Sequence, residues 1–521
     1  MSITIRDRLE LAGQLLLDIL DRENELMPIG GYEVAHDLGR WWDAILRLEE
    51  TIGFVIPADL EGASLRNLHL LADNPDRLMM NRVDVPWLAE AAIINPHNIR
   101  ETLLTYGQLF QRRRSLWARD AALELIKAVD AALQEDGRLD LTKLGTWGQV
   151  PPPDDPAAVL GPQQEGDWFD MTGSTGRALE AMVWMYESTE EPSILDLARR
   201  IAKHHLAYSV NADGSMRREI VDPANPGHCH SYHGTLRGLL LFGLLTDDAE
   251  CVKVVEKTYR NAVRNQMVKE SGWAPHDLGL DRFSNGYGDP CTDLAVPGDS
   301  AQLALWLALR AGCHDLLDDV ERLVRCRIFP AQKTEDDIRR YPDEVVAPNS
   351  MGSWTNSMPS HAGKDRCLLD VHAAVAHSLC DIYNNICTAT ADGLRVNLHL
   401  DYEDDAVKIV GRRDEVAEIS ISVTEPCDLM IRVPGWTVEE SVRITVDGKE
   451  IPVQREGVFA LAPGDALGDS ATVVISYELP EKETEETMVS GRVYRFKWRG
   501  DEIVGIDPQD EGINFYPAWA D

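Results

Sequence analysis

The sequence predicts a mainly helical N-terminal domain followed by a C-terminal all-β sandwich. From Ile5 to about Tyr383, apolar residues recur three and four positions apart, as in amphipathic helices. After Ile386 they alternate with polar residues, as in strands that bury one face. No strand-like segments separate the helices, so helix hairpins that close into a toroid or stack into a solenoid are favoured over a parallel α/β sheet. A strict sequence repeat is not found, which disfavours a consensus solenoid.

The elements follow from these patterns in order, with clusters of Pro, Gly and Asp between them. Helices are predicted at 38–49, 116–133, 176–186, 194–207, 236–245, 251–265, 300–311, 316–328 and 368–383. Strands are predicted at 394–400, 406–410, 417–423, 429–433, 442–446, 471–477 and 493–498, and Asp447-Gly448 marks a tight hairpin. We therefore assign residues 1–386 to the helical domain and 387–521 to the β-sandwich. The short junction predicts that the two domains pack rigidly.

Composition excludes several classes of partner. The chain has 521 residues with 87 acidic and 51 basic side chains, a net charge of −36, which disfavours nucleic acids and anionic membranes as partners. We find no signal-peptide pattern and no apolar run near the roughly 20 residues of a membrane span. The nine cysteines therefore indicate reduced thiols in a cytoplasmic protein, with Cys251, Cys326, Cys380 and Cys387 buried. A homo-oligomer is compatible with the sequence.

A first candidate cluster opens the helix that contains two tryptophans. His36 and Arg40 lie beside Trp41 and Trp42. Sugar sites place aromatic faces next to charged groups, because sugar rings stack on aromatics while hydroxyls need polar partners. We therefore assign these four residues to substrate binding. The alternative is a capped helix with tryptophans in the core, and we favour that alternative for at least one of the two.

A second cluster lies in His228-Cys-His-Ser-Tyr-His233, just before an apolar helix. Histidines are suited to proton transfer near neutral pH, so His230 and His233 are candidate catalytic residues. Zinc binding by all three histidines is disfavoured, because metal sites usually draw their ligands from more distant parts of the chain. The milder interpretation is that one or two of them reach a cavity as hydrogen-bond donors.

The third cluster is the segment 271–300, which concentrates acidic residues among glycines and prolines between two apolar helices. Loops of this kind on a rigid scaffold often carry binding and catalytic groups. Asp277 and Asp289 are candidate acid and base residues, and Trp273 and His276 are candidate substrate contacts. The alternative is a long acidic surface loop.

Several motifs, taken together in their order, resemble the bacterial β-L-arabinofuranosidase family of cysteine/zinc glycoside hydrolases. They are Leu38-Gly-Arg-Trp-Trp, Thr175-Gly-Arg-Ala-Leu-Glu, His230-Ser-Tyr-His-Gly-Thr-Leu-Arg-Gly, Asp289-Pro-Cys-Thr-Asp, Asp319-Val-Glu-Arg-Leu-Val-Arg, Cys367 and Ile431-Arg-Val-Pro-Gly-Trp436. The resemblance covers most of the chain. It implies an (α/α)6 barrel followed by a β-sandwich, in agreement with the pattern of apolar residues.

The resemblance also implies a metal centre. Family members with the full motif are retaining glycosidases in which zinc, held by a Glu-x-Cys pair and a Cys-Cys pair, keeps the nucleophilic sulfur as a thiolate. By position, Asp289, Cys291 and Cys367 match three of these ligands. Zinc bound by these three residues is therefore an expectation of the resemblance.

The sequence departs from the family at two positions. Arg366 stands where the nucleophilic cysteine is expected, and Trp273 falls near the position of the acid/base glutamate, with Glu270, Asp277 and Asp281 as the nearest carboxylates. An arginine cannot act as a nucleophile, but it can bind a carboxylate or phosphate of a substrate.

We therefore expect a glycoside hydrolase that acts on short oligosaccharides or small glycosides, with Arg40 and Arg366 suited to an acidic sugar. Asp277 and Asp289 would act as acid and base. The alternatives are an eliminase on a uronate or other modified sugar, with a histidine as the base, and a sugar-binding protein without catalysis.

Overall fold

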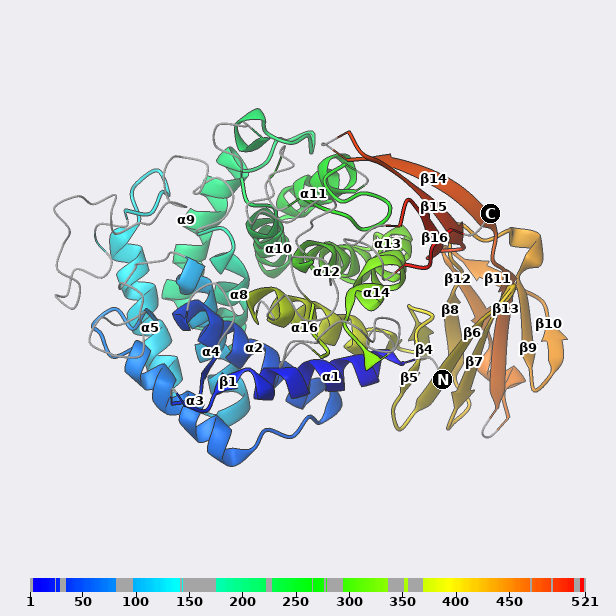
Figure 1. Ribbon diagram of the computed structural model, residues 1–521, viewed down its shortest axis with the longest axis horizontal. Helices are drawn as coiled ribbons and strands as arrows, with labels where there is room; N and C mark the ends of the chain where they lie inside the picture. Colours follow the sequence, from blue (N-terminus) through cyan, green and yellow to red (C-terminus); the bar gives the residue numbers. More distant parts are fainter. Residues whose placement is uncertain are drawn as a thin grey trace.

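Six helices form a closed ring at the centre of the N-terminal domain (Figure 1). Each packs against the next one in the chain, and the last packs against the first, so that the ring closes. The computed structural model describes residues 3–23, 25–28, 34–80, 97–140, 143, 175–221, 227–264, 266–275, 278, 294–335, 351–354, 369–468, 471–488, 491–509 and 516–519. The ring helices are α2 (Val34–Ile52), α4 (His97–Arg113), α8 (Ala178–Thr189), α10 (Cys229–Leu245), α12 (Ala295–Arg310) and α16 (Leu369–Asn384).

A second layer of helices surrounds this ring. The outer helices are α1 (Ile5–Asp18), α3 (Ala58–Leu71), α5 (Leu116–Ala132), α9 (Pro192–Tyr208), α11 (Ala249–Thr258) and α13 (Leu317–Leu323). Inner and outer helices alternate along the chain, and α2, α4, α8, α10 and α12 each pack against the outer helix that follows, while α16 packs against α1. The closed toroid is confirmed, and with it the (α/α)6 barrel that the family resemblance implies.

Connection length differs between the two ends of the barrel. Inner helices lead to outer helices through short links, such as 114–115 and 190–191. The return from outer to inner helices is long, as between α5 and α8 and between α13 and α16. All six inner helices therefore begin at the end of the barrel where the long connections lie, and we call that end the barrel mouth.

The all-β sandwich after α16 is also confirmed. Its six-stranded sheet has the order β10-β9-β13-β7-β6-β5, and its five-stranded sheet has the order β11-β12-β8-β4-β3. The strands are β3 (Cys387–Ala389), β4 (Gly393–Val396), β5 (Tyr402–Glu403), β6 (Val407–Arg413), β7 (Val416–Val423), β8 (Asp428–Arg432), β9 (Arg443–Val446), β10 (Lys449–Ile451), β11 (Gln454–Glu456), β12 (Phe459–Ala462) and β13 (Thr472–Glu478). The predicted hairpin joins β9 to β10, and both turn residues, Asp447 and Gly448, have positive φ.

A separate antiparallel sheet contains β14 (Glu481–Thr487), β15 (Val493–Arg499) and β16 (Glu502–Asp507). It runs from the sandwich back toward the outer helices (Figure 1). Short elements complete the described chain: β1 (Leu20–Asp21), β2 (Met27–Pro28), α14 (Phe329–Ala331), the 3-10 turns η3 (Arg218–Val221), η5 (His314–Leu316), η7 (Glu439–Ser441) and η8 (Gly464–Ala466), and the π-helical turns η4 (Tyr259–Val263) and η6 (Val324–Ile328).

The apolar pattern does not predict α4 and β14, and in both cases the failure has a clear physical reason. The ring helix α4 buries Asn98, Arg100, Glu101 and Thr102, so polar residues occupy positions that a buried helix normally fills with apolar ones. Strand β14 has the sequence Glu-Lys-Glu-Thr-Glu-Glu-Thr and shows no apolar alternation. Helices α1 and α3 are further additions to the predicted set.

The burial predicted for four cysteines is confirmed. Cys251, Cys326, Cys380 and Cys387 are buried, as expected. Among the described residues, no helix is both long and apolar enough to cross a membrane.

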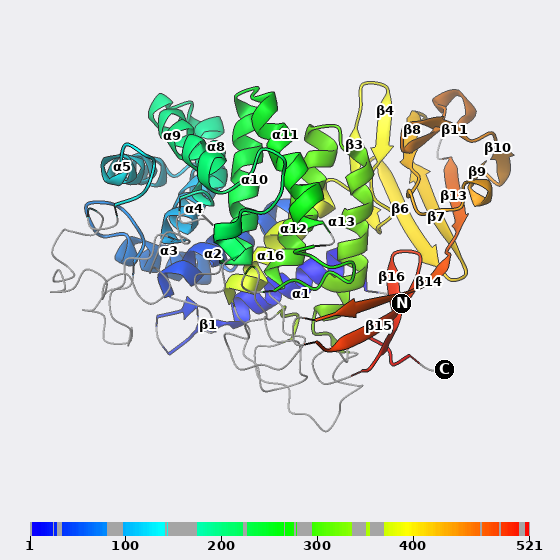
Figure 2. The ribbon, with the colours of Figure 1, turned by 90° about the horizontal axis from the view of Figure 1, so that it is seen from above.

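The helical domain and the sandwich are joined by buried ion pairs. In both views α13 is the helix beside the strands (Figures 1 and 2). Arg432, at the end of β8, bonds Asp318 at 2.5 Å and also bonds Glu321, both on α13. The backbone N–H of Gly435 donates to Asp318 at 2.9 Å. The 319–325 and 431–436 motifs of the family resemblance thus meet at this interface.

We predict that Arg432→Met lowers the free energy of unfolding by about 3–5 kcal/mol, because it leaves Asp318 and Glu321 without their main cation. Urea unfolding followed by circular dichroism measures the change. Arg412→Met on β6 is the matched control, since Arg412 is 71% exposed, and its effect should stay within about 0.5 kcal/mol. Equal effects in the two variants would contradict the assignment.

A buried histidine ties the ring to the outer layer. His372 of α16 donates from Nε2 to the carbonyl of Ala12 on α1 at 3.1 Å, and its ring stacks on Trp354. Burial lowers the pKa of His372 to about 4, although the bond to Ala12 offsets part of this effect. The unfolded chain therefore takes up this proton first as the pH falls below about 6.5, and stability declines between that pH and about 4.

His372→Gln tests this linkage, because glutamine can keep a donor for Ala12 but does not titrate. Between pH 7.5 and pH 5, the wild-type protein should lose about 2 kcal/mol more stability than the variant. Urea unfolding at the two pH values gives both numbers, and contributions from other histidines cancel in the difference. Identical pH slopes would refute the prediction.

Candidate active site in the barrel mouth

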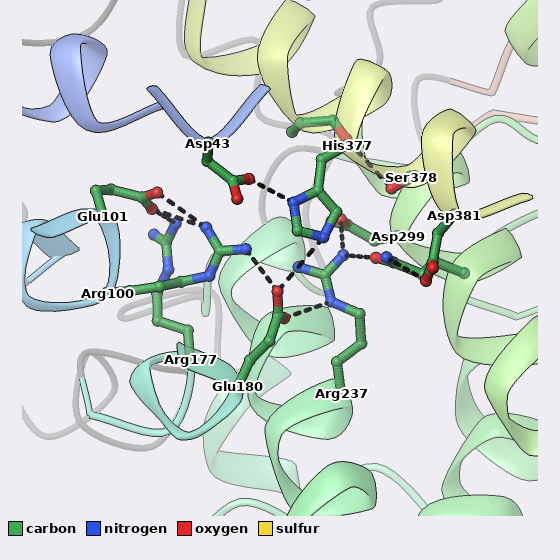
Figure 3. A network of polar contacts seen from close by, with 12 residues as sticks. Asp43, Arg100, Glu101, Arg177, Glu180, Arg237, Asp299, His377, Ser378 and Asp381 are labelled. Atoms are coloured by element: carbon green, nitrogen blue, oxygen red, sulfur yellow. Dashed lines mark hydrogen bonds and ion pairs between the residues drawn. The ribbon is translucent and has the colours of Figure 1, made fainter. Parts of the chain in front are cut away.

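Polar side chains from all six inner helices meet inside the ring (Figure 3). They are Arg40, Asp43 and Arg47 of α2, Arg100, Glu101 and Gln108 of α4, Arg177 and Glu180 at the start of α8, His230 and Arg237 of α10, Asp299 and Gln302 of α12, and His377 and Asp381 of α16. Most are buried. On most of the helices they lie three, four or seven residues apart, so they project from the same face of the helix into the ring. The interior of the ring is therefore a connected network of charges.

His230 lies at the upper part of this network, in the first turn of α10. Its Nδ1 is 2.5 Å from Oδ2 of Asp299, and its Nε2 is 2.6 Å from a guanidinium nitrogen of Arg40. A carboxylate accepts hydrogen bonds and a guanidinium donates them. We therefore assign the hydrogen to Nδ1 and the lone pair to Nε2, so His230 is a neutral imidazole held in one tautomer by its two neighbours.

Three arginines share the carboxylate of Glu101. Arg100 donates at 3.0 Å, Arg177 at 2.8 Å, and Nε of Arg40 lies 3.3 Å away. Burial opposes the ionisation of Glu101, but attraction to Arg100 and Arg40 outweighs it, and the pKa of the carboxyl falls below its usual range. Glu101 is thus a permanent anion that holds Arg40 and Arg177 at the mouth.

The network continues beneath this level toward the middle of the inner helices. Glu180 bonds Arg100 and Arg237, each at 3.0 Å. Arg237 also donates to Asp299 at 2.6 Å, which connects this lower level to His230. Nδ1 of His377 lies 2.5 Å from Asp43. These groups support the upper level from beneath and lie further from the mouth.

Four histidine rings line one side of the mouth. His36, His97, His228 and His230 follow each other with ring centroids 6.2, 6.5 and 5.9 Å apart. Burial lowers the pKa of His36 to about 3, and burial together with Arg177 lowers that of His97 well below its usual value. Within the described part of the chain, no three His, Cys, Asp or Glu side chains are arranged to hold a metal ion.

The predicted substrate contacts of α2 have different surroundings. Arg40 and His36 face the mouth, where Arg40 Nε points to His36 Nε2 at 3.5 Å. Trp41 is fully buried and donates to the carbonyl of Leu16 on α1, so it packs between the inner and outer helices. Trp42 is also fully buried and meets Trp41 edge to face. In this structure both tryptophans are core residues.

The predicted catalytic residue His233 lies deeper than His230. Its Nδ1 is 2.9 Å from the carbonyl of Cys229, one turn earlier in α10, and its Nε2 is 3.1 Å from the hydroxyl of Ser300 on α12. These bonds join α10 to α12. The observed contacts of His233 are thus those of a side chain that holds two helices together.

The third cluster is described in part. Trp273 is buried in a turn before the long connection to α12. The predicted residues His276, Asp277, Asp289, Cys291, Arg366 and Cys367 lie outside the described residues. One contact nevertheless relates this segment to the second cluster, because the N–H of Leu278 donates to the carbonyl of Gly227 at 2.7 Å. Two clusters far apart in the sequence are thus neighbours at the mouth.

Several functional candidates were not predicted from the sequence, among them His97, Glu101, Arg177 and Asp299. A usable signal exists in the helical patterns. Arg40, Asp43 and Arg47, for example, form a polar stripe at helical spacing within an apolar helix. Such a stripe is ordinarily interpreted as a solvent-exposed face. A single sequence cannot show that this polar face meets the polar faces of the other five inner helices.

Comparison with solved structures identifies the class of fold. No protein-family model matches the sequence, and a search of curated proteins finds no significant match. The fold is that of glycoside hydrolases with an (α/α)6 barrel and a β-sandwich.

In particular, the chain is similar to a GH127 β-L-arabinofuranosidase from Geobacillus stearothermophilus T6, with 13% identity, a TM-score of 0.56, and coverage of 95% of this chain and 80% of that one. A second GH127 β-arabinofuranosidase gives 14% identity, a TM-score of 0.57, and coverage of 96% and 81%. A structure described as a glycoside hydrolase gives 12% identity, a TM-score of 0.60, and coverage of 96% and 80%. At these identities the likeness establishes the fold.

The contacts of Asp299 predict how His230 responds to substitution. In Asp299→Asn, Arg237 still needs an acceptor, so the amide oxygen faces Arg237 and the amide N–H₂ faces Nδ1 of His230. The imidazole hydrogen should then move to Nε2 and break the bond from Arg40. Histidine ¹⁵N NMR, assigned with a His230→Asn variant, reports the tautomer directly. A variant that retains the Nδ1–H form would contradict this arrangement.

Proposed function

We propose that the protein is a glycoside hydrolase that binds a short oligosaccharide or small glycoside in the barrel mouth. The observation that carries the proposal is the convergence at one end of the ring of the six helix N-termini, the Asp299–His230–Arg40 chain and the long connections. The fold likeness to GH127 enzymes over 95% of the chain supports it. Fold alone does not determine chemistry, so the proposal depends on the site.

The mouth suits a polar substrate that carries negative charge. The positive ends of the six inner helices point there, and Arg40 and Arg177 are held in place by Glu101. Arg366 would add a third guanidinium. We infer that an acidic sugar, with its carboxylate on these groups, is preferred over a neutral one.

In the proposed reaction, Asp277 and Asp289 act as general acid and general base on the two sides of the glycosidic bond. Nε2 of His230, with its lone pair, accepts a hydrogen bond from a sugar hydroxyl when Arg40 turns to the substrate. The fixed tautomer makes His230 an acceptor at this point. Trp273 and His276 would line the entrance.

The resemblance supports a second role for Asp289, as a ligand of a metal ion, and this role is an alternative to its role as an acid or base. One carboxylate and two thiolates, from Asp289, Cys291 and Cys367, form a ligand set that zinc accepts. When bound, zinc would hold the sulfurs as thiolates and fix their orientation. Elemental analysis of the purified protein and of its Cys291→Ser variant measures this, with about one zinc per chain expected in the wild type and little in the variant.

The test of the proposed function is turnover of a panel of aryl glycosides and short oligosaccharides that includes β-L-arabinofuranosides and uronides. We expect release of a reducing sugar from at least one substrate, and a decrease of about 10²- to 10⁴-fold in kcat/KM for Asp289→Asn. His69→Gln on the outer helix α3 should retain activity. If binding is measured but the wild-type protein turns over no substrate, the protein binds sugars without catalysis.

Elimination on a uronate sugar is the second candidate, and the Asp299–His230 pair favours it. A carboxylate that orients a neutral imidazole is an arrangement suited to a general base. Elimination produces a conjugated double bond that absorbs in the ultraviolet, whereas hydrolysis does not. The absorbance of the product mixture with a uronide substrate therefore distinguishes the two reactions.

A further inference from the structure

The three-stranded sheet near the end of the chain contacts the segment that leads into the third cluster. Glu486 of β14 is 8% exposed, and its carboxylate accepts two hydrogen bonds from Ser271. The backbone N–H donates to Oε1 at 2.8 Å, and the hydroxyl donates to Oε2 at 2.6 Å. The two residues are 215 positions apart in the sequence. This bidentate contact is specific, because it uses both oxygens of one buried carboxylate.

Ser271 lies in a turn whose geometry leaves little freedom. The N–H of Lys269 donates to the carbonyl of Trp273 at 2.8 Å, and the N–H of Gly272 donates to that of Lys269 at 2.9 Å. Gly272 has φ +78°, and a Cβ there would lie 2.6 Å from Cβ of Arg327. The turn therefore needs glycine and packs directly against the π-helical turn η6.

The segment after this turn reaches the mouth within a few residues. Trp273 is buried beside Lys269, whose ammonium lies 5.8 Å from the centre of its ring. Leu278 bonds Gly227, the residue that precedes His228. Ser271 is thus held by the sheet, and Leu278 is held by the residue that precedes His228.

We propose that Glu486 is a positioning residue, which sets the placement of residues 269–275 and of Leu278, and through them the wall of the barrel mouth beside His228. The functional part of this inference depends on the proposed function, since it assumes that a saccharide binds there. The β14–β16 sheet is then a support for the site as well as an extension of the sandwich.

The neighbouring contacts explain why Glu486 carries this role. Lys482, also on β14, pairs with Glu270, but that pair is largely exposed and contributes little to rigidity. Glu486 is buried, so removing its carboxylate leaves the Ser271 N–H and hydroxyl without an acceptor in a place that water reaches poorly. Glutamine has the same shape and retains both bonds, with its oxygen accepting from the N–H and its amide donating to the hydroxyl.

Three variants test the proposal: Glu486→Ala, the conservative Glu486→Gln, and the matched control Glu485→Ala on the exposed face of the same strand. Hydrogen–deuterium exchange of the full-length protein is measured on peptides that cover 266–278. We expect at least tenfold faster exchange in Glu486→Ala, and rates within about twofold of the wild type in the other two variants. With an active saccharide, kcat/KM should fall about 10- to 100-fold in Glu486→Ala and recover in Glu486→Gln.

The outcomes distinguish the positioning role of Glu486 from the proposed glycoside hydrolase function. Unchanged exchange of 266–278 in Glu486→Ala, or an equal increase in Glu485→Ala, overturns the positioning role. Faster exchange with fully retained turnover overturns its link to the site. If the wild-type protein turns over no saccharide, the proposed function fails, whereas the exchange comparison still decides whether Glu486 positions the segment.

Discussion

The interior of the ring is organised by one electrostatic constraint: every charge buried there must face an opposite charge. Moving an ionised side chain out of water is costly, and the loss is recovered only when partners and geometry are right. Glu101, Glu180 and Asp299 each meet this condition through arginines from other helices. The six inner helices consequently cannot slide independently, because a shift of one of them would break ion pairs or side-chain hydrogen bonds to its neighbours.

This constraint also divides the network into a lower part that stabilises the ring and an upper part that can contact a substrate. In the lower part of the network, Glu180 and His377 form ion pairs and hydrogen bonds with other side chains of the ring. This part therefore acts as a structural core that consists of charged residues. The upper part, around His230 and Arg40, has the same rigidity but lies where the inner helices begin. In such a site the tautomer of His230 and the positions of Glu101 and Asp299 are fixed before a ligand arrives.

Much of the fold could be predicted from the sequence, because burial imposes periods of 3.6 and 2 on most elements. The prediction failed where burial was polar: α4 carries Arg100 and Glu101 into the ring, and β14 buries Glu486 in a strand of charged residues. The site was predicted in part. His230 and Arg40 were predicted because each belongs to a dense local cluster of polar residues. The role of Asp299 could not be predicted, because its partners lie on helices that are distant in the sequence.

The same limit applies to the two tryptophans. Aromatic residues beside charged ones favour a sugar site, but the pattern does not determine which side of an inner helix they occupy. Trp41 bonds α1 and therefore faces outward from the ring. The row of histidines could not be predicted either, because its four rings come from three separate segments. No single segment contains the pattern.

The contact between Glu486 and Ser271 has a consequence for how the protein is made. A ribosome releases the barrel helices first, and Ser271 emerges 215 residues before the carboxylate that holds it. During synthesis the ring can close around its ion pairs, since domains tend to fold as they appear. The turn beside the mouth, however, stays without its anchor until β14 has been translated. Maturation of the site is therefore a late event, which follows completion of the barrel and depends on the last sheet.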